Sequence, residues 1–313
     1  MKKVGIIGAS GFIGSYVTKQ FLESGFLVKA SVTDLSRTQK YEHLKQFKNA
    51  QNLQIATLDV TDKNQLADFV KDCDIVIHGG TPFQLNFTDA KKELLDPTII
   101  GTKNFLEVVN DAPKVSKVVV ISSVASWNTN FPMPAGDKSF TDTYDETQER
   151  FMSEESHPYA QAKFLANKAV YEFLDYQSDI SFELTSVSPV GVMGKALSTR
   201  EDSTSMGLQY LIKNKIAPDA FVQAMFDHDI LFAIVDVEDV AHAIFKAATT
   251  SGLHAKDYLL SSESYKVSDI NLMLNLQEPK ETGQIIYKNN KAIKDLVIDF
   301  KAVKQTLNNY SSN

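Results

Sequence analysis

Tyr159 and Lys163 are the residues whose types and spacing point most directly to chemistry. A tyrosine hydroxyl can donate a proton to a substrate oxygen, although an ordinary phenol has a pKa near ~10, which is high for proton transfer at neutral pH. On a helix, a lysine four residues later lies on the same face, and its positive charge would lower the pKa of the phenol. The pair therefore predicts a general acid whose pKa is tuned by a neighbouring cation.

The surroundings of the pair distinguish it from accidental occurrences of the same spacing. The chain contains two further Tyr-x-x-x-Lys pairs, Tyr41/Lys45 and Tyr287/Lys291. Both lie in charged or polar stretches. The helical face of Tyr159 and Lys163 instead continues through Ala166, Val170 and Phe173, and a lysine on such an apolar face needs a functional reason. Only the middle pair is therefore predicted to be catalytic.

A cluster of serines follows the apolar segment 118–121, which reads as a strand. Ser122, Ser123 and Ser126 each offer a hydroxyl that could hydrogen-bond a substrate carbonyl oxygen. Each could equally cap the turn after the strand, which is a common use of serine. From the residues alone the choice among the three stays open.

A glycine-rich turn lies near the start of the chain. Gly8-Ala9-Ser10-Gly11-Phe12-Ile13-Gly14 follows the apolar segment 4–7 and precedes an amphipathic stretch. Small residues allow a tight turn and a close approach of a pyrophosphate to the backbone, and the following helix offers unpaired N–H groups. A plain turn could carry the same glycines, but the strand–turn–helix order favours a dinucleotide site. The predicted ligands of the pyrophosphate are Gly8, Ser10, Gly11, Phe12 and Ile13.

The end of the second predicted strand bears on the choice of cofactor. Sites for NAD usually carry an acidic residue there, whereas the 2′-phosphate of NADP favours a cation. The strand ends in the neutral Val32 and Thr33, and Arg37 and Lys40 follow. We therefore predict NADP, bound by Thr33, Arg37 and Lys40, with NAD as the less expected cofactor. Arg37 could also be a solvated helix residue.

The elements that position these residues alternate regularly in the first half of the chain. Alternation of apolar strands with amphipathic helices is typical of a doubly wound α/β fold with a parallel Rossmann sheet. The strands are predicted at residues 4–7, 27–32, 53–58, 75–78 and 118–121, and the helices at 12–24, 37–47, 63–71 and 90–110.

The second half is less regular and predicts a smaller, discontinuous substrate lobe. A long helix is expected over 158–177 and another over 237–249. The parallel sheet is expected to be completed by strands at 182–187 and 232–235, and a short further strand is expected at 258–260. The Rossmann domain would comprise residues 1–192 and 230–250, and the α/β substrate lobe 193–229 and 251–313.

Composition narrows the class of protein. The net charge of −7 gives no reason to expect nucleic acid or an anionic membrane as a partner. Cys73 is the only cysteine, so an internal disulfide is excluded and a cytoplasmic protein is expected. The six histidines show no ligand spacing with one another or with Cys73, so no metal site is predicted. Monomer and homodimer both remain open.

Several further segments resemble the extended short-chain dehydrogenases/reductases, in particular dihydroflavonol reductases and related aldehyde/ketone reductases of the NAD-dependent epimerase/dehydratase superfamily. The resembling segments are 78–83, 96–104, 188–194 and 232–241. The resemblance implies that Ser123 hydrogen-bonds the carbonyl oxygen. It implies cofactor contacts by Asp59, Val60, Gly79, Gly80, Thr81, Tyr159, Lys163, Pro189 and Val192. It implies substrate contacts by Phe83, Ser123, Asn128, Tyr159 and Val190, although Asn128 could be a turn residue.

The resemblance implies an enzyme that reduces a ketone or aldehyde to an alcohol with NADPH through a Ser-Tyr-Lys triad. Two departures from the family matter: Thr33 stands where the family usually has arginine, and the Asn-Trp-Tyr-Cys-Tyr segment of cinnamoyl-CoA reductases is absent, which disfavours that activity. One alternative is a nucleotide-sugar epimerase or dehydratase with permanently bound NAD. Another is a non-enzymatic NADP-binding redox sensor, although such sensors usually lack the Tyr/Lys pair.

Overall fold

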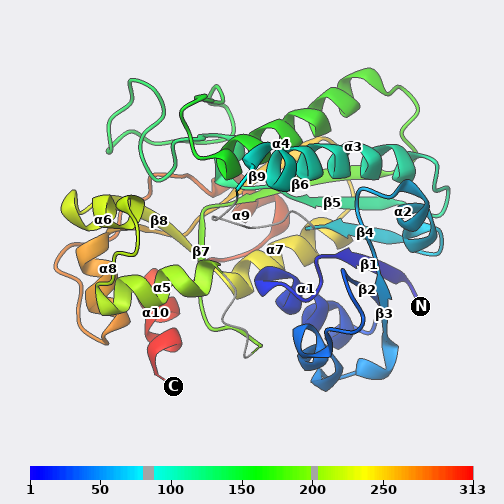
Figure 1. Ribbon diagram of the computed structural model, residues 1–313, viewed down its shortest axis with the longest axis horizontal. Helices are drawn as coiled ribbons and strands as arrows, with labels where there is room; N and C mark the ends of the chain where they lie inside the picture. Colours follow the sequence, from blue (N-terminus) through cyan, green and yellow to red (C-terminus); the bar gives the residue numbers. More distant parts are fainter. Residues whose placement is uncertain (80–87, 199–203, 313) are drawn as a thin grey trace.

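The core of the protein is a seven-stranded parallel sheet with helices on both faces (Figure 1). The computed structural model describes residues 1–79, 88–198 and 204–312. The strand order β3-β2-β1-β4-β5-β6-β9 reverses direction between β1 and β4, so the predicted doubly wound α/β fold is confirmed. The strands are β1 (Lys3–Ile7), β2 (Leu27–Val32), β3 (Leu53–Thr57), β4 (Ile75–His78), β5 (Lys117–Ile121), β6 (Glu183–Pro189) and β9 (Lys256–Leu260).

Each face of the sheet has its own layer of helices. One layer contains α1 (Phe12–Glu23) and α7 (Val237–Thr249), and the other contains α2 (Lys63–Val70), α3 (Asp96–Asn110) and α4 (Pro158–Tyr176). Successive strand residues point to opposite faces. On β5, Val119 therefore packs with the α1 layer, whereas Val118 and Val120 pack with the other layer. Burial on both faces explains why these strands are almost continuously apolar.

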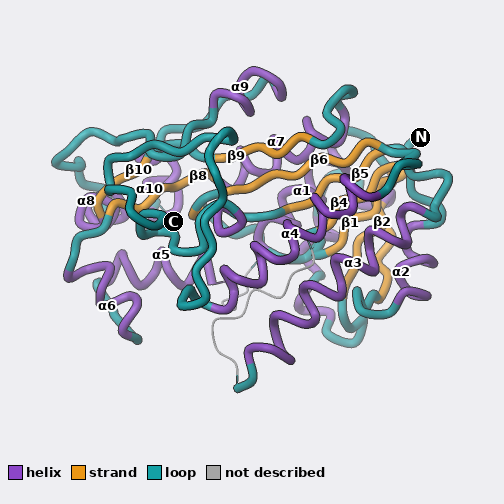
Figure 2. Tube along the Cα trace, turned by 90° about the horizontal axis from the view of Figure 1, so that it is seen from above, coloured by secondary structure: helices purple, strands orange, loops and turns teal. Residues whose placement is uncertain are grey.

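A smaller sheet forms the second lobe. Its strand order is β10-β8-β7, from β10 (Ser264–Lys266), β8 (Leu231–Asp236) and β7 (Gly191–Met193). The surrounding helices are α5 (Thr204–Asn214), α6 (Ala220–Asp227), α8 (Val267–Leu274) and α10 (Val303–Ser311), and α9 (Asn290–Leu296) lies by β9. Figure 2 shows the lobe gathered at one end of the molecule and the parallel strands at the other.

The seventh strand of the large sheet corrects one prediction. The segment 232–235 was expected in the parallel sheet, but it lies in β8 and pairs with β7 and β10. The large sheet is completed by β9, which pairs with β6. The expected domain division assigned residues 230–250, which contain β8, to the Rossmann domain, and residues 251–313, which contain β9, to the lobe. The strand pairing is the reverse: β8 belongs to the small sheet and β9 to the large one. Both segments are short apolar runs, and an apolar run does not specify its pairing partner.

The segment after β2 corrects a second prediction. A helix was expected over 37–47, but the chain forms two short 3-10 turns, Thr38–Lys40 and Glu42–Gln46. Local hydrogen bonds compete with a continuous helix here. The Asp34 carboxylate accepts from both the backbone N–H and the hydroxyl of Ser36, and the Tyr41 hydroxyl donates to the Leu35 carbonyl.

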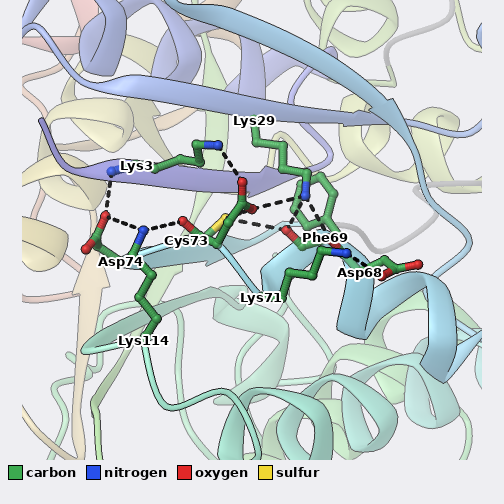
Figure 3. A network of polar contacts seen from close by, with 9 residues as sticks. Lys3, Lys29, Asp68, Phe69, Lys71, Cys73, Asp74 and Lys114 are labelled. Carbon is green, nitrogen blue, oxygen red and sulfur yellow. Dashed lines mark hydrogen bonds and ion pairs between the residues drawn. The ribbon is translucent and has the colours of Figure 1, made fainter.

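A polar network fastens α2 to the edge of the sheet where the strands begin (Figure 3). The buried Lys29 ammonium donates to the carbonyls of Asp68 and Phe69, both at 2.8 Å, and these carbonyls belong to the last turn of α2. The Asp72 carboxylate lies 3.2 Å from the same ammonium. Cys73 is fully buried in this network, and burial raises the pKa of its thiol to about 12. These contacts therefore stabilise the attachment of α2 to the sheet.

Within residues 1–79, 88–198 and 204–312, no helix is both long and apolar enough to cross a membrane.

Candidate active site

A large cavity opens where the parallel strands end, between the sheet and the smaller lobe. Its volume is about 1870 Å³. Parallel α/β sheets bind ligands at this edge, near the point where strand order reverses. The sequence-predicted residues that line the cavity are Gly8, Ser10, Gly11, Phe12, Ile13, Thr33, Lys40, Asp59, Val60, Gly79, Ser123, Tyr159, Lys163, Pro189, Val190 and Val192. Gly80, Thr81 and Phe83 lie outside the described residues.

The glycine turn forms part of the cavity wall. Gly8 has a φ of +83°, a conformation that favours glycine. A Cβ added to Gly14 would lie 2.0 Å from the carbonyl oxygen of Gly8, so this position excludes any side chain. The hydroxyl of Ser31 on β2 accepts the N–H of Gly8 at 3.0 Å. The turn and the first residues of α1 are therefore held in a narrow backbone arrangement at the cavity wall.

The two cations that were predicted to bind the cofactor, Arg37 and Lys40, lie in different positions after β2. Thr33 and Lys40 line the cavity, as predicted. Arg37 lies away from it: its side chain is 59% exposed, and its Nε lies 3.4 Å from the Asp34 carboxylate. The prediction that Arg37 contacts the cofactor is therefore not supported by the geometry. Breaking the expected helix into 3-10 turns changes which side chains share a face.

Tyr159, Lys163 and Ser123 all line the cavity. Tyr159 and Lys163 lie in the first two turns of α4, and Ser123 follows β5. The Ser123 hydroxyl acts on the Tyr159 phenol as a hydrogen-bonding group that lowers its pKa. The Lys163 ammonium donates to the carbonyl of Ile121, the last residue of β5, at 3.3 Å. The hydroxyl of Ser122 instead accepts from the Asn167 amide at 3.0 Å, which separates its role from that of Ser123.

Burial controls the charge state of the pair. Burial raises the pKa of the Tyr159 phenol above its ordinary value, and the hydrogen bond from Ser123 partly opposes this effect. Burial also lowers the pKa of Lys163 to about 8. The expected lowering of the phenol pKa by Lys163 is therefore not found: burial raises this pKa, and Ser123 is the group that acts against the rise. At neutral pH the phenol carries its proton and the lysine is mostly charged, which is the arrangement of a proton donor beside a cation.

In the two Tyr/Lys pairs that were not predicted to be catalytic, the tyrosine side chains are buried in the protein. The Tyr41 ring is buried, and its hydroxyl donates to a backbone carbonyl. The Tyr287 ring is stacked on Tyr144 at a centroid distance of 4.9 Å. Its hydroxyl accepts a hydrogen bond from Asn128 at 3.1 Å. Both tyrosines therefore contribute to packing and hydrogen bonding inside the fold, although their neighbours in the sequence are polar.

Asn128 does not reach the cavity, so the prediction that it contacts substrate is not supported. Its side chain is fully buried. The amide donates to the Met133 carbonyl at 2.8 Å and to the Tyr287 hydroxyl, and the amide oxygen accepts the N–H of Asn130 at 3.0 Å. Asn128 therefore fixes the loop that follows Ser123.

That loop and the smaller lobe supply apolar cavity walls that the sequence did not predict. The unpredicted residues of this wall are Phe131, Pro132, Met133, Pro134, Phe140, Phe221 and Phe232. The signal available in the sequence was the apolar run 131–134, which begins five residues after Ser126. The lobe residues carry no comparable signal, because only the three-dimensional fold brings α6 and β8 to the site.

Comparisons with known proteins agree with this geometry. The model of the "NAD dependent epimerase/dehydratase family" matches residues 4–261. The cinnamoyl-CoA reductase CAD2 of Medicago truncatula is 28% identical over 253 residues, covering 80% of this chain and 74% of the relative. The NADPH-dependent methylglyoxal reductase GRE2 of Saccharomyces cerevisiae is 27% identical over 340 residues, covering 98% and 96%.

A solved structure is similar over almost its whole length. The crystal structure of yeast methylglyoxal/isovaleraldehyde reductase Gre2 complexed with NADPH has a TM-score of 0.82 and 25% identity, and the match covers 99% of this chain and 97% of that one. The family match includes the glycine turn, the parallel strands and the helix of Tyr159 and Lys163. The chain belongs to the NAD-dependent epimerase/dehydratase family, among the extended short-chain dehydrogenases/reductases.

Proposed function

We propose that this protein reduces a ketone or aldehyde to an alcohol with NADPH, using Ser123, Tyr159 and Lys163. The observation that carries the proposal is that Ser123, Tyr159 and Lys163 line the same cavity as the glycine turn. The relatives named above are reductases, which supports an NAD(P)-dependent oxidoreductase.

The cavity fits a dinucleotide. The absence of a side chain at Gly14 lets α1 pack closely against the turn at Gly8, and the first turn of α1 supplies N–H groups for a pyrophosphate. Lys40 and Thr33 would hold the 2′-phosphate, and Asp59 and Val60 would lie by the adenine. Gly79, Pro189, Val192, Tyr159 and Lys163 would surround the nicotinamide end.

NADP is the cofactor that the relatives support. The yeast relative is named an NADPH-dependent reductase, and its solved structure contains NADPH. In this chain Val32 leaves the end of β2 without the acidic side chain that binds the ribose of NAD. Lys40 at the cavity offers the cation that a 2′-phosphate favours.

The protein's own residues supply the proton and the orientation. Bound NADPH would supply the hydride. Tyr159 would donate its proton to the carbonyl oxygen, and the raised pKa keeps that proton in place at neutral pH. Ser123 would hold the same oxygen by a hydrogen bond. Lys163 would stabilise the phenolate left after donation and would hold the ribose.

The test is NADPH consumption by the purified protein with a panel of aldehydes, ketones and α-dicarbonyls, including methylglyoxal and isovaleraldehyde. We expect turnover with part of the panel and ready release of the oxidised cofactor. Copurifying NAD that resists removal, together with interconversion of a nucleotide sugar, would establish an epimerase or dehydratase instead. Cofactor binding without turnover on any carbonyl would favour a redox sensor.

We also propose that residues 193–229 and 261–313, together with β8, form the substrate lobe, and that the protein is cytoplasmic. The lobe proposal rests on the small sheet and on Phe221 and Phe232, which line the cavity. Chimeras that exchange the lobe with that of a relative should change carbonyl preference and keep cofactor affinity. Fractionation of the native host would test the location.

A further inference from the structure

The helix that carries Tyr159 begins with a histidine cap. His157 is the N-cap residue of α4, and its Nδ1 accepts the backbone N–H of Tyr159 at 3.2 Å. Its carbonyl accepts the N–H groups of Ala160 and Gln161. The first N–H groups of a helix have no partner within the helix, so a side-chain acceptor at this position fixes the first turn. Here the fixed residue is the proposed proton donor itself.

This cap depends on the charge state of the imidazole. Nδ1 accepts a hydrogen bond only when it carries no proton, because an imidazolium has two N–H donors and no acceptor. An imidazolium would also face the positive end of the helix dipole. Serine, threonine, asparagine and aspartate, the usual N-cap residues, do not lose their acceptor near neutral pH. A histidine in this place makes the first turn of α4 sensitive to acid.

The surroundings of His157 contain a partner of opposite charge. His157 lines the cavity, as does Asp219, the N-cap residue of α6 in the smaller lobe. His157 is partly exposed; its partial burial holds its pKa below the ordinary value, and the Asp219 carboxylate acts in the opposite direction. The other charged residues that line the cavity are Lys40, Asp59, Lys138, Glu155 and Lys163.

We propose that His157 is a positioning residue for Tyr159: the neutral imidazole holds the first turn of α4, and its protonation releases that turn and lowers turnover. The inference rests on the proposed function, since it needs Tyr159 as the proton donor. His157 acts through the backbone of Tyr159. The enzyme should therefore lose turnover on acidification through a group other than Tyr159 or Lys163.

Two variants separate capping from titration. His157→Ala removes the cap and should lower kcat at neutral pH roughly fivefold, the factor implied by a lost N-cap, while the affinity for NADPH stays close to that of the wild type. His157→Asn retains an acceptor that does not titrate. It should rescue most of the lost kcat and flatten the acid limb of the pH profile between about pH 5 and pH 7.

A second pair of variants tests the charge around the imidazole. Asp219→Asn keeps an N-cap side chain for α6 and removes the carboxylate that raises the pKa of His157. The acid limb of kcat should then move to lower pH. His228→Asn removes a histidine at the other end of α6 and should leave the acid limb in place.

Thermal unfolding tests the cap without any need for activity. The folded state disfavours protonated His157, so its contribution to stability is complete above the ordinary pKa of ~6.5 and is lost as the pH falls below it. The His157→Asn protein should lose less stability than the wild type on acidification. An Asn variant with the wild-type acid limb, or an Ala variant with unchanged kcat, would overturn the inference. A wild type without carbonyl turnover would overturn the proposed function, while the unfolding comparison would still decide the cap.

Discussion

At Tyr159, burial and hydrogen bonding act on the same phenol in opposite directions. Burial disfavours the phenolate, whereas the hydrogen bond from Ser123 favours it. The balance keeps the proton on the oxygen at neutral pH, as a reductase needs before it protonates a carbonyl. The reverse reaction needs the phenolate and should therefore be favoured only at higher pH.

Replacing Tyr159 by phenylalanine tests the assignment of the acid. The ring and its packing remain, so Tyr159→Phe should fold, and the loss of a general acid should lower kcat by about 10²- to 10⁴-fold. Steady-state kinetics and circular dichroism measure the two effects. Tyr41→Phe is the control and should keep wild-type turnover, since its hydroxyl serves only a backbone carbonyl. A folded Tyr159→Phe enzyme with more than about a tenth of wild-type turnover would contradict the assignment.

The lowered pKa of Lys163 predicts opposite responses of activity and stability to alkali. The ammonium is lost above about pH 8, so kcat/KM, which reports the free enzyme, should fall there. The unfolded state keeps its proton up to the ordinary lysine pKa, so the free energy of unfolding should rise over the same pH range. Kinetics and urea unfolding measured between about pH 7 and pH 10 give both curves. An activity that falls only near the ordinary lysine pKa would show that burial does not control this group.

The two cations after β2 predict a contrast in cofactor affinity. Lys40→Ala should weaken NADPH binding about tenfold, the loss of one hydrogen bond to a charged group, and should leave NADH binding nearly unchanged. Arg37→Ala is the matched control, because Arg37 lies beside Asp34 and away from the cavity. Fluorescence titration with both cofactors measures the effect. Weaker NADPH binding by Arg37→Ala, with unchanged binding by Lys40→Ala, would instead identify Arg37 as the ligand of the 2′-phosphate.

At the scale of elements, the sequence predicted a helix or strand correctly where the apolar periodicity and the residues at the two ends of the segment indicated the same element. The helix expected over 158–177 is α4, and it carries Tyr159 and Lys163 on the face that the apolar pattern indicated. The segment 37–47 shows the limit, since Asp34 and Tyr41 make local hydrogen bonds that periodicity cannot include. That error affected the predicted site, because Arg37 and Lys40 were both expected to bind the cofactor and only Lys40 lines the cavity.

The glycine turn predicts a sharp difference between two Gly→Ala variants. In Gly14→Ala the new Cβ would meet the Gly8 carbonyl oxygen at 2.0 Å, so the turn must open and NADPH binding should be lost. Gly207 lies in α5 with open space around it, and Gly207→Ala should raise the free energy of unfolding by about 0.5–1 kcal/mol without affecting the cofactor. Calorimetry and cofactor titration measure both variants. Normal NADPH binding by Gly14→Ala would show that the turn adapts.

At the scale of the molecule, the sheet partners and the cavity walls were the parts that the sequence could not supply. The segments of β8 and β9 are both short and apolar, and their exchange between sheets depends on contacts with distant strands. Phe221 and Phe232 reach the cavity only because the lobe folds over the sheet edge. The family, the fold, the enzyme class and NADP were predicted correctly, because they depend on local motifs in a fixed order.

Arg150 joins several of these distant elements. Its guanidinium donates to the Ser126 carbonyl after β5, to Asn167 and Tyr171 on α4, and to the Asp257 carboxylate of β9 at 3.0 Å. It also lies over the Trp127 ring at 3.8 Å. The Asp257 side chain is only 5% exposed, so its charge depends on these partners. Arg150 therefore connects the segment after β5, helix α4 and the last strand of the large sheet.

Removing this arginine should destabilise the whole protein. Arg150→Met keeps much of the side-chain volume but leaves the Asp257 carboxylate without its cation, which should lower the free energy of unfolding by about 3 kcal/mol. This value is the lower end for a broken buried pair, because Tyr171 and Ser188 still donate to the carboxylate. Lys168→Ala, which breaks an exposed pair with Glu172, is the control and should change stability by less than about 0.5 kcal/mol. Equal unfolding midpoints for the two variants in urea would show that Arg150 does not hold these elements together.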